Sequence, residues 1–180
     1  IVTYAGSSQV KANGIFADNK LQLSRIIDSL NASGGTNGAD GIQTAYNLAE
    51  KYFVAGGINR VILATDGDLN VGVTTQSGLE DLITEKKECG VFLSVLGFGQ
   101  GNINDVNMET LADKGNGNYA YIDSSFEANK VLVQQLGATL FTVAKDVKLQ
   151  VEFNPEKVES YRLIGYENRV MDAEDFNDDT

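Results

Sequence analysis

Two uninterrupted apolar runs constrain what this 180-residue chain can fold into. Residues 60–65 read Arg-Val-Ile-Leu-Ala-Thr and residues 91–96 read Val-Phe-Leu-Ser-Val-Leu, without the alternation of a strand that has one wet face. Strands of this kind are covered on both faces, as they are in parallel sheets. Stretches with a helical apolar period precede and separate them. The alternation of strand and helix signals predicts an α/β domain with a mainly parallel sheet and flanking helices.

Turn signals and apolar periods place the other elements. Residues 1–5 and 9–12 flank a Gly-Ser-Ser turn and predict a hairpin. Helices are predicted over residues 23–30, 42–53, 77–90, 108–115 and 124–143, and a last parallel strand over 119–122. Capping-box spacing at Ser77 with Glu80, and at Ser124 with Glu127, marks the start of two of these helices.

The pattern changes after residue 145. Apolar and polar residues alternate over 147–153, which is the period of a strand with one solvated face. Residues 154–157 (Asn-Pro-Glu-Lys) predict a turn into a returning strand, and so a C-terminal β-hairpin. We therefore predict an α/β domain over residues 1–144, the β-rich start of a further region over 145–170, and an acidic tail over 171–180.

Composition excludes several classes of function. The chain has no His, one Cys and a formal net charge of -11. Catalysis by Ser-His-Asp or Cys-His, His-containing zinc sites, an internal disulfide and Cys-rich metal clusters are therefore excluded. Cys89 is predicted to be a small packing residue. The acidity argues against a nucleic-acid partner, and no apolar run approaches the roughly 20 residues that span a bilayer.

Three loops should meet at one edge of the sheet. Residues 35–36 precede a helix, residues 66–67 end one strand and residues 97–101 end another. In an open α/β sheet this carboxyl edge is where ligands bind. Thr36 has a hydroxyl at a helix start, where an N-cap is the alternative role. Asp66 ends an apolar strand, where we expect its carboxylate to be hydrogen-bonded, ion-paired or bound to a cation. Hydroxyl and carboxylate oxygens suit Mg²⁺, Mn²⁺ or Ca²⁺.

Other interpretations of these loops were weighed. The spacing Asp66-x-Asp68-x-Asn70 begins like an EF-hand loop, but its sixth position lacks Gly and its twelfth lacks Glu. A nucleotide-binding α/β domain that uses Gly97–Gly101 stays an alternative, although Asn102 stands where the fingerprint has its third Gly. No nucleophile has an activating base, so we expect no enzyme activity and assign no catalytic residue.

Together the loops resemble the von Willebrand factor type A domain, in particular its bacterial branch. The matching segments are residues 34–37 (Gly-Gly-Thr-Asn) with 41–49, residues 61–70 and residues 96–99. Their order and spacing fit from Ile1 to about residue 143. Residues 141–147 and 161–169 are similar to a region that follows this domain in one group of bacterial members. The resemblance implies a Rossmann-like, doubly wound sheet.

The resemblance also implies a non-catalytic module for protein recognition or adhesion. In such domains a metal-ion-dependent adhesion site holds a divalent cation through an Asp-x-Ser-x-Ser loop, a Thr hydroxyl and an Asp, and a carboxylate of the partner protein completes the coordination. By position, Thr36 and Asp66 would be the second-loop and third-loop metal ligands. The implied cofactor is Mg²⁺, Mn²⁺ or Ca²⁺. Relatives of this kind imply a bacterial protein at the cell envelope or outside the cell.

One departure from the family is large. The Asp-x-Ser-x-Ser loop and the first, central strand would lie before Ile1, so we expect a truncated domain with half a metal site and weak or no metal binding. A structural or assembly domain without an ion is therefore an alternative. The missing strand would leave two unpaired edges, between the strands at residues 1–5 and 60–65. We expect the gap to close, or to be filled by another copy in a strand-sharing dimer or by residues 147–153.

Overall fold

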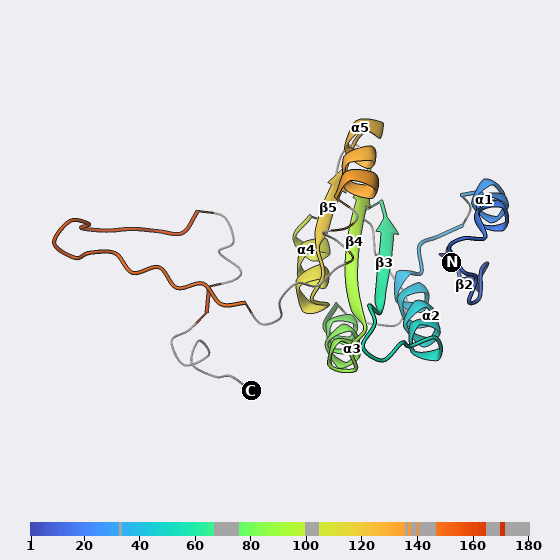
Figure 1. Ribbon diagram of the computed structural model, residues 1–180, viewed down its shortest axis with the longest axis horizontal. Coiled ribbons are helices and arrows are strands. Elements are labelled where there is room, and N and C mark those ends of the chain that lie inside the picture. Colours follow the sequence, from blue (N-terminus) through green and yellow to red (C-terminus); the bar gives the residue numbers. More distant parts are fainter. Residues whose placement is uncertain are drawn as a thin grey trace. The chain divides into compact units, whose positions relative to one another are not determined.

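The computed structural model describes residues 1–32, 34–66, 76–99, 105–135, 137, 140, 147–164 and 170–171. The chain divides into two compact units, Ile1–Thr142 and Val143–Thr180, which are described separately (Figure 1). No helix among the described residues is long and apolar enough to cross a membrane.

A parallel three-stranded sheet forms the centre of the first unit. Its order is β3 (Arg60–Thr65), β4 (Phe92–Phe98) and β5 (Tyr119–Ile122), with β4 in the middle (Figure 1). Ile62 lies opposite Ser94, and Leu96 lies opposite Ala120. The central strand is buried along six of its seven residues, which explains its apolar run without alternation. The predicted α/β fold is confirmed.

Helices cover both faces of this sheet. The larger core joins β3 and β4 to α2 (Gly38–Lys51), α3 (Gln76–Glu88) and α4 (Asp105–Lys114). Its buried members are Ile42, Tyr46, Leu63, Leu79, Ile83, Val91, Leu93, Val95, Met108, Leu111 and Ala112. On the other face, Leu96 and Ile122 pack against Val131 of η1 (Lys130–Gln134), a π-helix that continues α5 (Ser125–Asn129). The sheet is therefore doubly wound.

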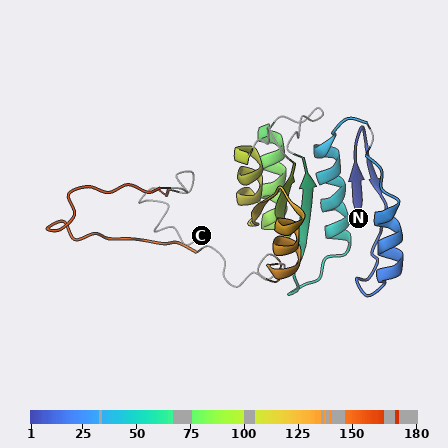
Figure 2. The same ribbon diagram turned by 90° about the horizontal axis from the view of Figure 1, so that it is seen from above.

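A separate antiparallel hairpin stands beside the main sheet. It consists of β1 (Val2–Tyr4) and β2 (Ser8–Val10), and α1 (Lys20–Asp28) follows it. Helix α2 contacts β1, β2 and β3 and so packs against both sheets. Figure 2 shows α2 between the hairpin and β3 in projection. The two sheets are not joined by strand pairing. The prediction that the gap closes is therefore wrong for the single chain.

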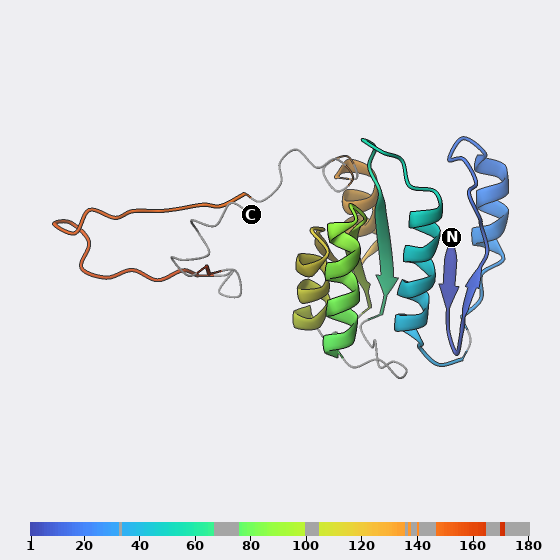
Figure 3. The ribbon, with the colours of Figure 1, turned by 90° about the horizontal axis from the view of Figure 1, so that it is seen from below.

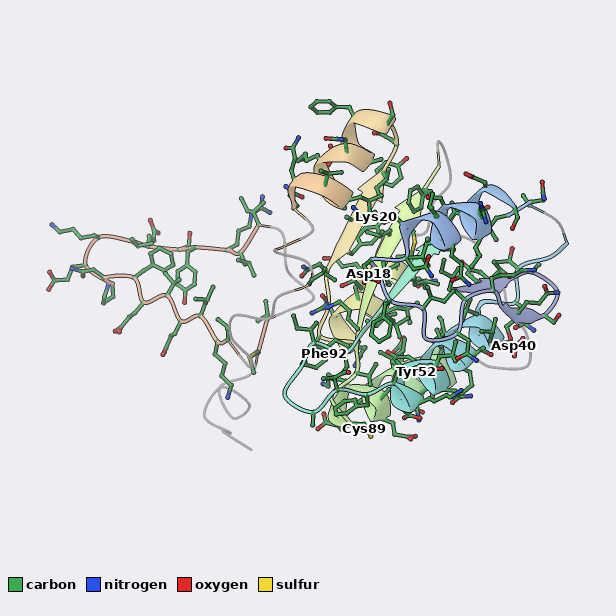
Figure 4. All side chains as sticks on the ribbon, turned by 45° about the vertical axis from the view of Figure 1, so that its right-hand side comes forward. Asp18, Lys20, Asp40, Tyr52, Cys89 and Phe92 are labelled. Carbon is green, nitrogen blue, oxygen red and sulfur yellow. The ribbon has the colours of Figure 1, made fainter. Side chains whose placement is uncertain are left out.

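Several predicted boundaries differ from the structure. Helix α3 begins at Gln76, so Ser77 lies inside its first turn and is not its N-cap. Ser124 is the N-cap of α5, and its hydroxyl accepts a hydrogen bond of 3.2 Å from the Glu127 N–H, as predicted. Cys89 is exposed just after α3 (Figure 4), so its predicted packing role is wrong.

The second unit contains the predicted turn but no assigned strand in residues 147–164. Within the turn, the N–H groups of Lys157 and Val158 each donate a hydrogen bond of 3.0 Å to the Asn154 carbonyl oxygen. The rings of Phe153 and Tyr161 lie 4.5 Å apart by their centroids and connect the two arms. A two-stranded ribbon without a packing partner is marginally stable in water, which explains a turn without a ladder. The predicted acidic tail lies almost wholly outside the described residues.

Candidate functional site

Thr36 and Asp66 line one cavity at the carboxyl end of β3. Thr36 lies in the loop before α2, and Asp66 directly follows β3. The cavity has a volume of about 710 Å³, and its walls include β1, the end of β3 and the segment after α1. Phe98, at the end of β4, also lines it. The structure thus brings the two predicted ligands to one cavity from separate loops.

Thr36 is not a helix cap. The N-cap of α2 is Asn37, whose side-chain oxygen accepts a hydrogen bond of 3.3 Å from the Asp40 N–H. The Thr36 hydroxyl is half-buried and has no hydrogen-bond partner among the described residues. The alternative role that the sequence left open for Thr36 is therefore wrong, and its oxygen stays available for a ligand.

Hydrogen bonds from α2 hold this loop against the hairpin. The Asn37 N–H donates to the Ala5 carbonyl oxygen. The Asp40 carboxylate, at the start of α2 (Figure 4), accepts a hydrogen bond of 2.6 Å from the Ser8 N–H. That hydrogen bond lowers the pKa of Asp40 below its usual value. The Ser8 and Thr44 hydroxyls share a further hydrogen bond of 2.9 Å. The position of Thr36 is therefore set by its neighbours on both sides.

Asp66 is exposed, and its carboxylate has no partner among the residues that the structure describes. The sequence-based expectation of a hydrogen-bonded or ion-paired carboxylate is not met there. Its physical premise was burial, and an exposed carboxylate is satisfied by water. Asp66 is therefore free to bind a cation but does not need one to be stable in the folded chain.

Tyr4 is a residue at this edge that the sequence reasoning missed. Its hydroxyl donates a hydrogen bond of 2.7 Å to the Ala64 carbonyl oxygen, two residues before Asp66. Burial raises the pKa of the Tyr4 phenol, a hydrogen bond with the Thr65 side chain lowers it, and the charge of Asp66 raises it. A tyrosine in a short strand carries no sequence signal for this role, because the contact joins residues sixty positions apart.

The oxygen donors fit part of a divalent-cation site. A hydroxyl and a carboxylate are hard ligands of the right class, but two of them leave most of an octahedron to water. No group of three or more His, Cys, Asp or Glu that could hold a metal occurs among the described residues. Asp68 and the other residues of the rejected EF-hand spacing up to residue 75 lie outside that part of the chain.

Gly97, the first residue of the alternative nucleotide loop, has a packing role. A Cβ at this position would lie 3.0 Å from the Tyr119 hydroxyl oxygen and 3.2 Å from the Met108 methyl carbon. Glycine therefore lets α4 and β5 approach the end of β4. Gly99 has a φ of 142°, which favours glycine. Residues 100–104 lie outside the described residues, so the nucleotide-binding alternative stays a prediction.

Comparison with known families decides the class of the domain. A family model of the von Willebrand factor type A domain matches residues 1–136. The chain belongs to the von Willebrand factor type A (VWA) family. A second model, for the C-terminal region of the uncharacterized protein YfbK, matches residues 138–180. The sequence-based resemblance is thereby confirmed for the VWA domain and for the bacterial region that follows it.

The VWA chain is also similar to one whole protein. It is 50% identical over 179 residues to "Uncharacterized protein YfbK" of Escherichia coli (strain K12). The match covers 99% of this chain and 31% of that protein, so the chain spans about a third of the length of its relative.

Solved structures share the VWA fold. BatB from Bacteroides thetaiotaomicron is 19% identical with a TM-score of 0.61, and the match covers 77% of each chain. The SpRpn10 VWA domain is 18% identical with a TM-score of 0.59, over 79% of this chain and 74% of that one. Proximal thread matrix protein 1 from the mussel byssus, with a zinc-occupied MIDAS motif, is 21% identical with a TM-score of 0.51, over 76% and 35%. At these identities the likeness is one of fold.

Proposed function

We propose that this VWA domain is a non-catalytic protein-recognition module whose binding face is the carboxyl end of β3. One observation carries the proposal: Thr36 and Asp66 reach the same cavity from separate loops, and neither side chain is engaged by another described residue. Family membership supports it, because VWA domains generally take part in protein–protein interaction. The cavity lies where open α/β sheets bind ligands.

A divalent cation, Mg²⁺ or alternatively Mn²⁺ or Ca²⁺, is the proposed link to the partner. The Thr36 hydroxyl and the Asp66 carboxylate would hold it, and the cation would supply a positive centre for a carboxylate of the partner protein. Exposure of Asp66 supports access from solution. With two protein donors, residues 1–180 should bind the cation weakly, with a millimolar dissociation constant.

Paramagnetic NMR with Mn²⁺ tests the proposed metal ligands. In the isotope-labelled chain, Mn²⁺ should broaden the amide signals around Thr36 and Asp66, and Asp66→Ala should abolish this broadening. Asp123→Ala is the matched control, because Asp123 is exposed and follows β5 as Asp66 follows β3, but it does not line the cavity. Broadening that survives Asp66→Ala would overturn the assignment. Micromolar affinity in calorimetry, lost in Asp66→Ala, would instead show a complete site.

Sodium acetate tests the proposed carboxylate of the partner. Acetate should shift the amide signals of residues 34–36 in the presence of Mg²⁺ and leave them unchanged without the cation. An equal shift without Mg²⁺ would contradict a cation-mediated contact.

A metal-independent structural or assembly role is the second candidate. The small number of described donors at the cavity favours it. In that case Mn²⁺ would broaden no signals at Thr36 and Asp66, and the variants would behave like the parent chain. We also propose a location at the bacterial cell envelope or outside the cell, which the family resemblance implies and cell fractionation tests.

A further inference from the structure

The edge of β3 that faces away from β4 is open. The Phe92 N–H donates a hydrogen bond of 3.0 Å to the Asn59 carbonyl oxygen, so the main-chain groups of Asn59 point toward β4. Main-chain groups alternate along an extended strand. Those of Ile62 and Ala64 therefore point away from β4, and the hydrogen bond from Tyr4 to the Ala64 oxygen agrees with this.

Strand β1 presents a matching open edge. The Lys11 N–H donates a hydrogen bond of 2.9 Å to the Ile1 carbonyl oxygen, and the Ala5 N–H donates one of 3.2 Å to the Ser7 oxygen. Ile1, Thr3 and Ala5 therefore face β2, whereas the main-chain groups of Val2 and Tyr4 face away from it. Figures 2 and 3 show β1 and β3 running in the same direction, with β1 nearer to β3 than β2 is.

The space between these two edges is lined mostly by apolar side chains. Beside the cavity at Thr36 and Asp66, a second cavity of about 730 Å³ extends between the same strands. Its lining includes Val2–Tyr4 of β1, residues 61–64 of β3, and Ile42, Ala45 and Ala49 of α2. Leu30, just after α1, lines both cavities. Both open edges thus border a space that helical segments cover with apolar side chains.

Tyr4 bridges this space. Two strands that flank one missing strand lie about 9.6 Å apart, twice the spacing of neighbouring strands. An extended tyrosine side chain together with its hydrogen bond of 2.7 Å covers such a span. The Tyr4 side chain packs against the backbone of α2 at Gly41, where an added Cβ would lie 2.7 Å from the Tyr4 Cβ. The phenol therefore holds an acceptor, the Ala64 oxygen, that a pairing strand would need.

We propose that the space between β1 and β3 is a receptor for one extended peptide segment from outside residues 1–180. The segment pairs with both open edges and displaces the Tyr4 hydroxyl from the Ala64 oxygen. Only an extended main chain offers donors and acceptors to two strand edges at once. The apolar lining selects a segment that is apolar on both faces. This binding is separate from the proposed cation site and does not depend on it.

Fluorescence anisotropy with a labelled peptide tests the receptor. The probe is a Val/Ile peptide of about eight residues with Ser at both ends, and the control peptide has Pro at alternate positions and cannot form a ladder. The full chain should bind the first peptide saturably and not bind the second. Equal binding of both peptides, or no binding of the first by any variant, would overturn the proposal.

Two variants place the peptide in the proposed space. Tyr4→Phe frees the Ala64 oxygen and should tighten binding several-fold. Tyr121→Phe is the matched control, because the Tyr121 hydroxyl also donates a hydrogen bond of 2.7 Å to a main-chain oxygen, that of Gly99, away from the space. An equal effect of both variants would contradict displacement of Tyr4.

Val2→Pro removes an N–H that faces the space and leaves the pairing of Thr3 with Gln9 in place. It should abolish peptide binding, while circular dichroism shows an unchanged fold. Ile62→Pro tests the opposite edge in the same way if Val2→Pro does not fold. Asp66→Ala should leave peptide binding unchanged, which separates this proposal from the cation site. A dimer in sedimentation equilibrium that Val2→Pro converts to monomer would make a second copy the occupant and overturn the proposal.

Discussion

The hydroxyl of Tyr4 donates a hydrogen bond of 2.7 Å to the carbonyl oxygen of Ala64, and this bond links the hairpin to the strand that ends at the candidate site. No strand pairing joins the two sheets in the described part of the chain. Helix α2, which contacts both sheets, provides the apolar part of the connection.

Tyr4→Phe should lower the free energy of unfolding by about 1 kcal/mol in the absence of peptide, because one intramolecular hydrogen bond is lost and the ring stays packed. Urea unfolding followed by circular dichroism measures the change. Tyr121→Phe again serves as the control for a lost hydroxyl. An unchanged midpoint for Tyr4→Phe would show that this bond does not stabilise the chain.

Thr36→Val should leave the stability nearly unchanged, whereas Asn37→Ala should cost about 1 kcal/mol, because Asn37 caps α2 and Thr36 does not. Thermal unfolding of both variants under the same conditions separates the two roles. The reverse order would restore the N-cap role that the sequence left open for Thr36.

Ser94→Ala should destabilise the fold by about 2 kcal/mol. The Ser94 hydroxyl is fully buried in β4 and accepts hydrogen bonds from the Arg60 guanidinium at 2.7 Å and from the Asn118 N–H at 3.2 Å. Its removal takes an acceptor from two donors in a region where burial lowers the pKa of Arg60. Urea unfolding gives the difference. Ser29→Ala, which removes a hydroxyl from an exposed position, is the control and should change little.

Tyr46→Phe should stabilise the chain at neutral pH by about 1 kcal/mol and reduce its loss of stability in alkali. The Tyr46 hydroxyl is buried without a hydrogen-bond partner among the described residues. Burial raises the pKa of Tyr46 well above its ordinary value of 10.0. Above pH 10 the unfolded chain releases this proton while the folded chain keeps it, so the free energy of unfolding falls as the pH rises.

Urea unfolding at pH 9 and pH 11 measures this effect. The parent chain should lose more stability between the two values than Tyr46→Phe does. Tyr4, whose pKa is also raised by burial, leaves part of the loss in the variant. Equal losses in the two proteins would contradict the role of Tyr46.

The sequence predicted those elements whose burial is uniform along the chain. The apolar run at residues 60–65 became β3, because a strand covered on both faces needs apolar residues at every position. The predicted strand over residues 147–153 is not assigned, since alternation shows amphipathic character but does not supply a partner.

The candidate site was predictable only in part. Order and spacing brought Thr36 and Asp66 to one cavity. The choice of Asn37 instead of Thr36 as the cap depends on backbone geometry at adjacent residues, which composition does not determine. The exposure of Asp66 and the reach of Tyr4 to Ala64 depend on how two sheets pack around α2, which no local pattern encodes.

The position of α2 between two unjoined sheets also has a consequence for local unfolding. The hairpin of β1 and β2 can detach without breaking any hydrogen bond of the ladder that joins β3, β4 and β5. Its amides should therefore exchange with deuterated water through partial openings, while those of β4 exchange only when the whole unit opens. Residues 2–10 then form a cooperative unit of their own, whose lifetime is set by its contacts with α2.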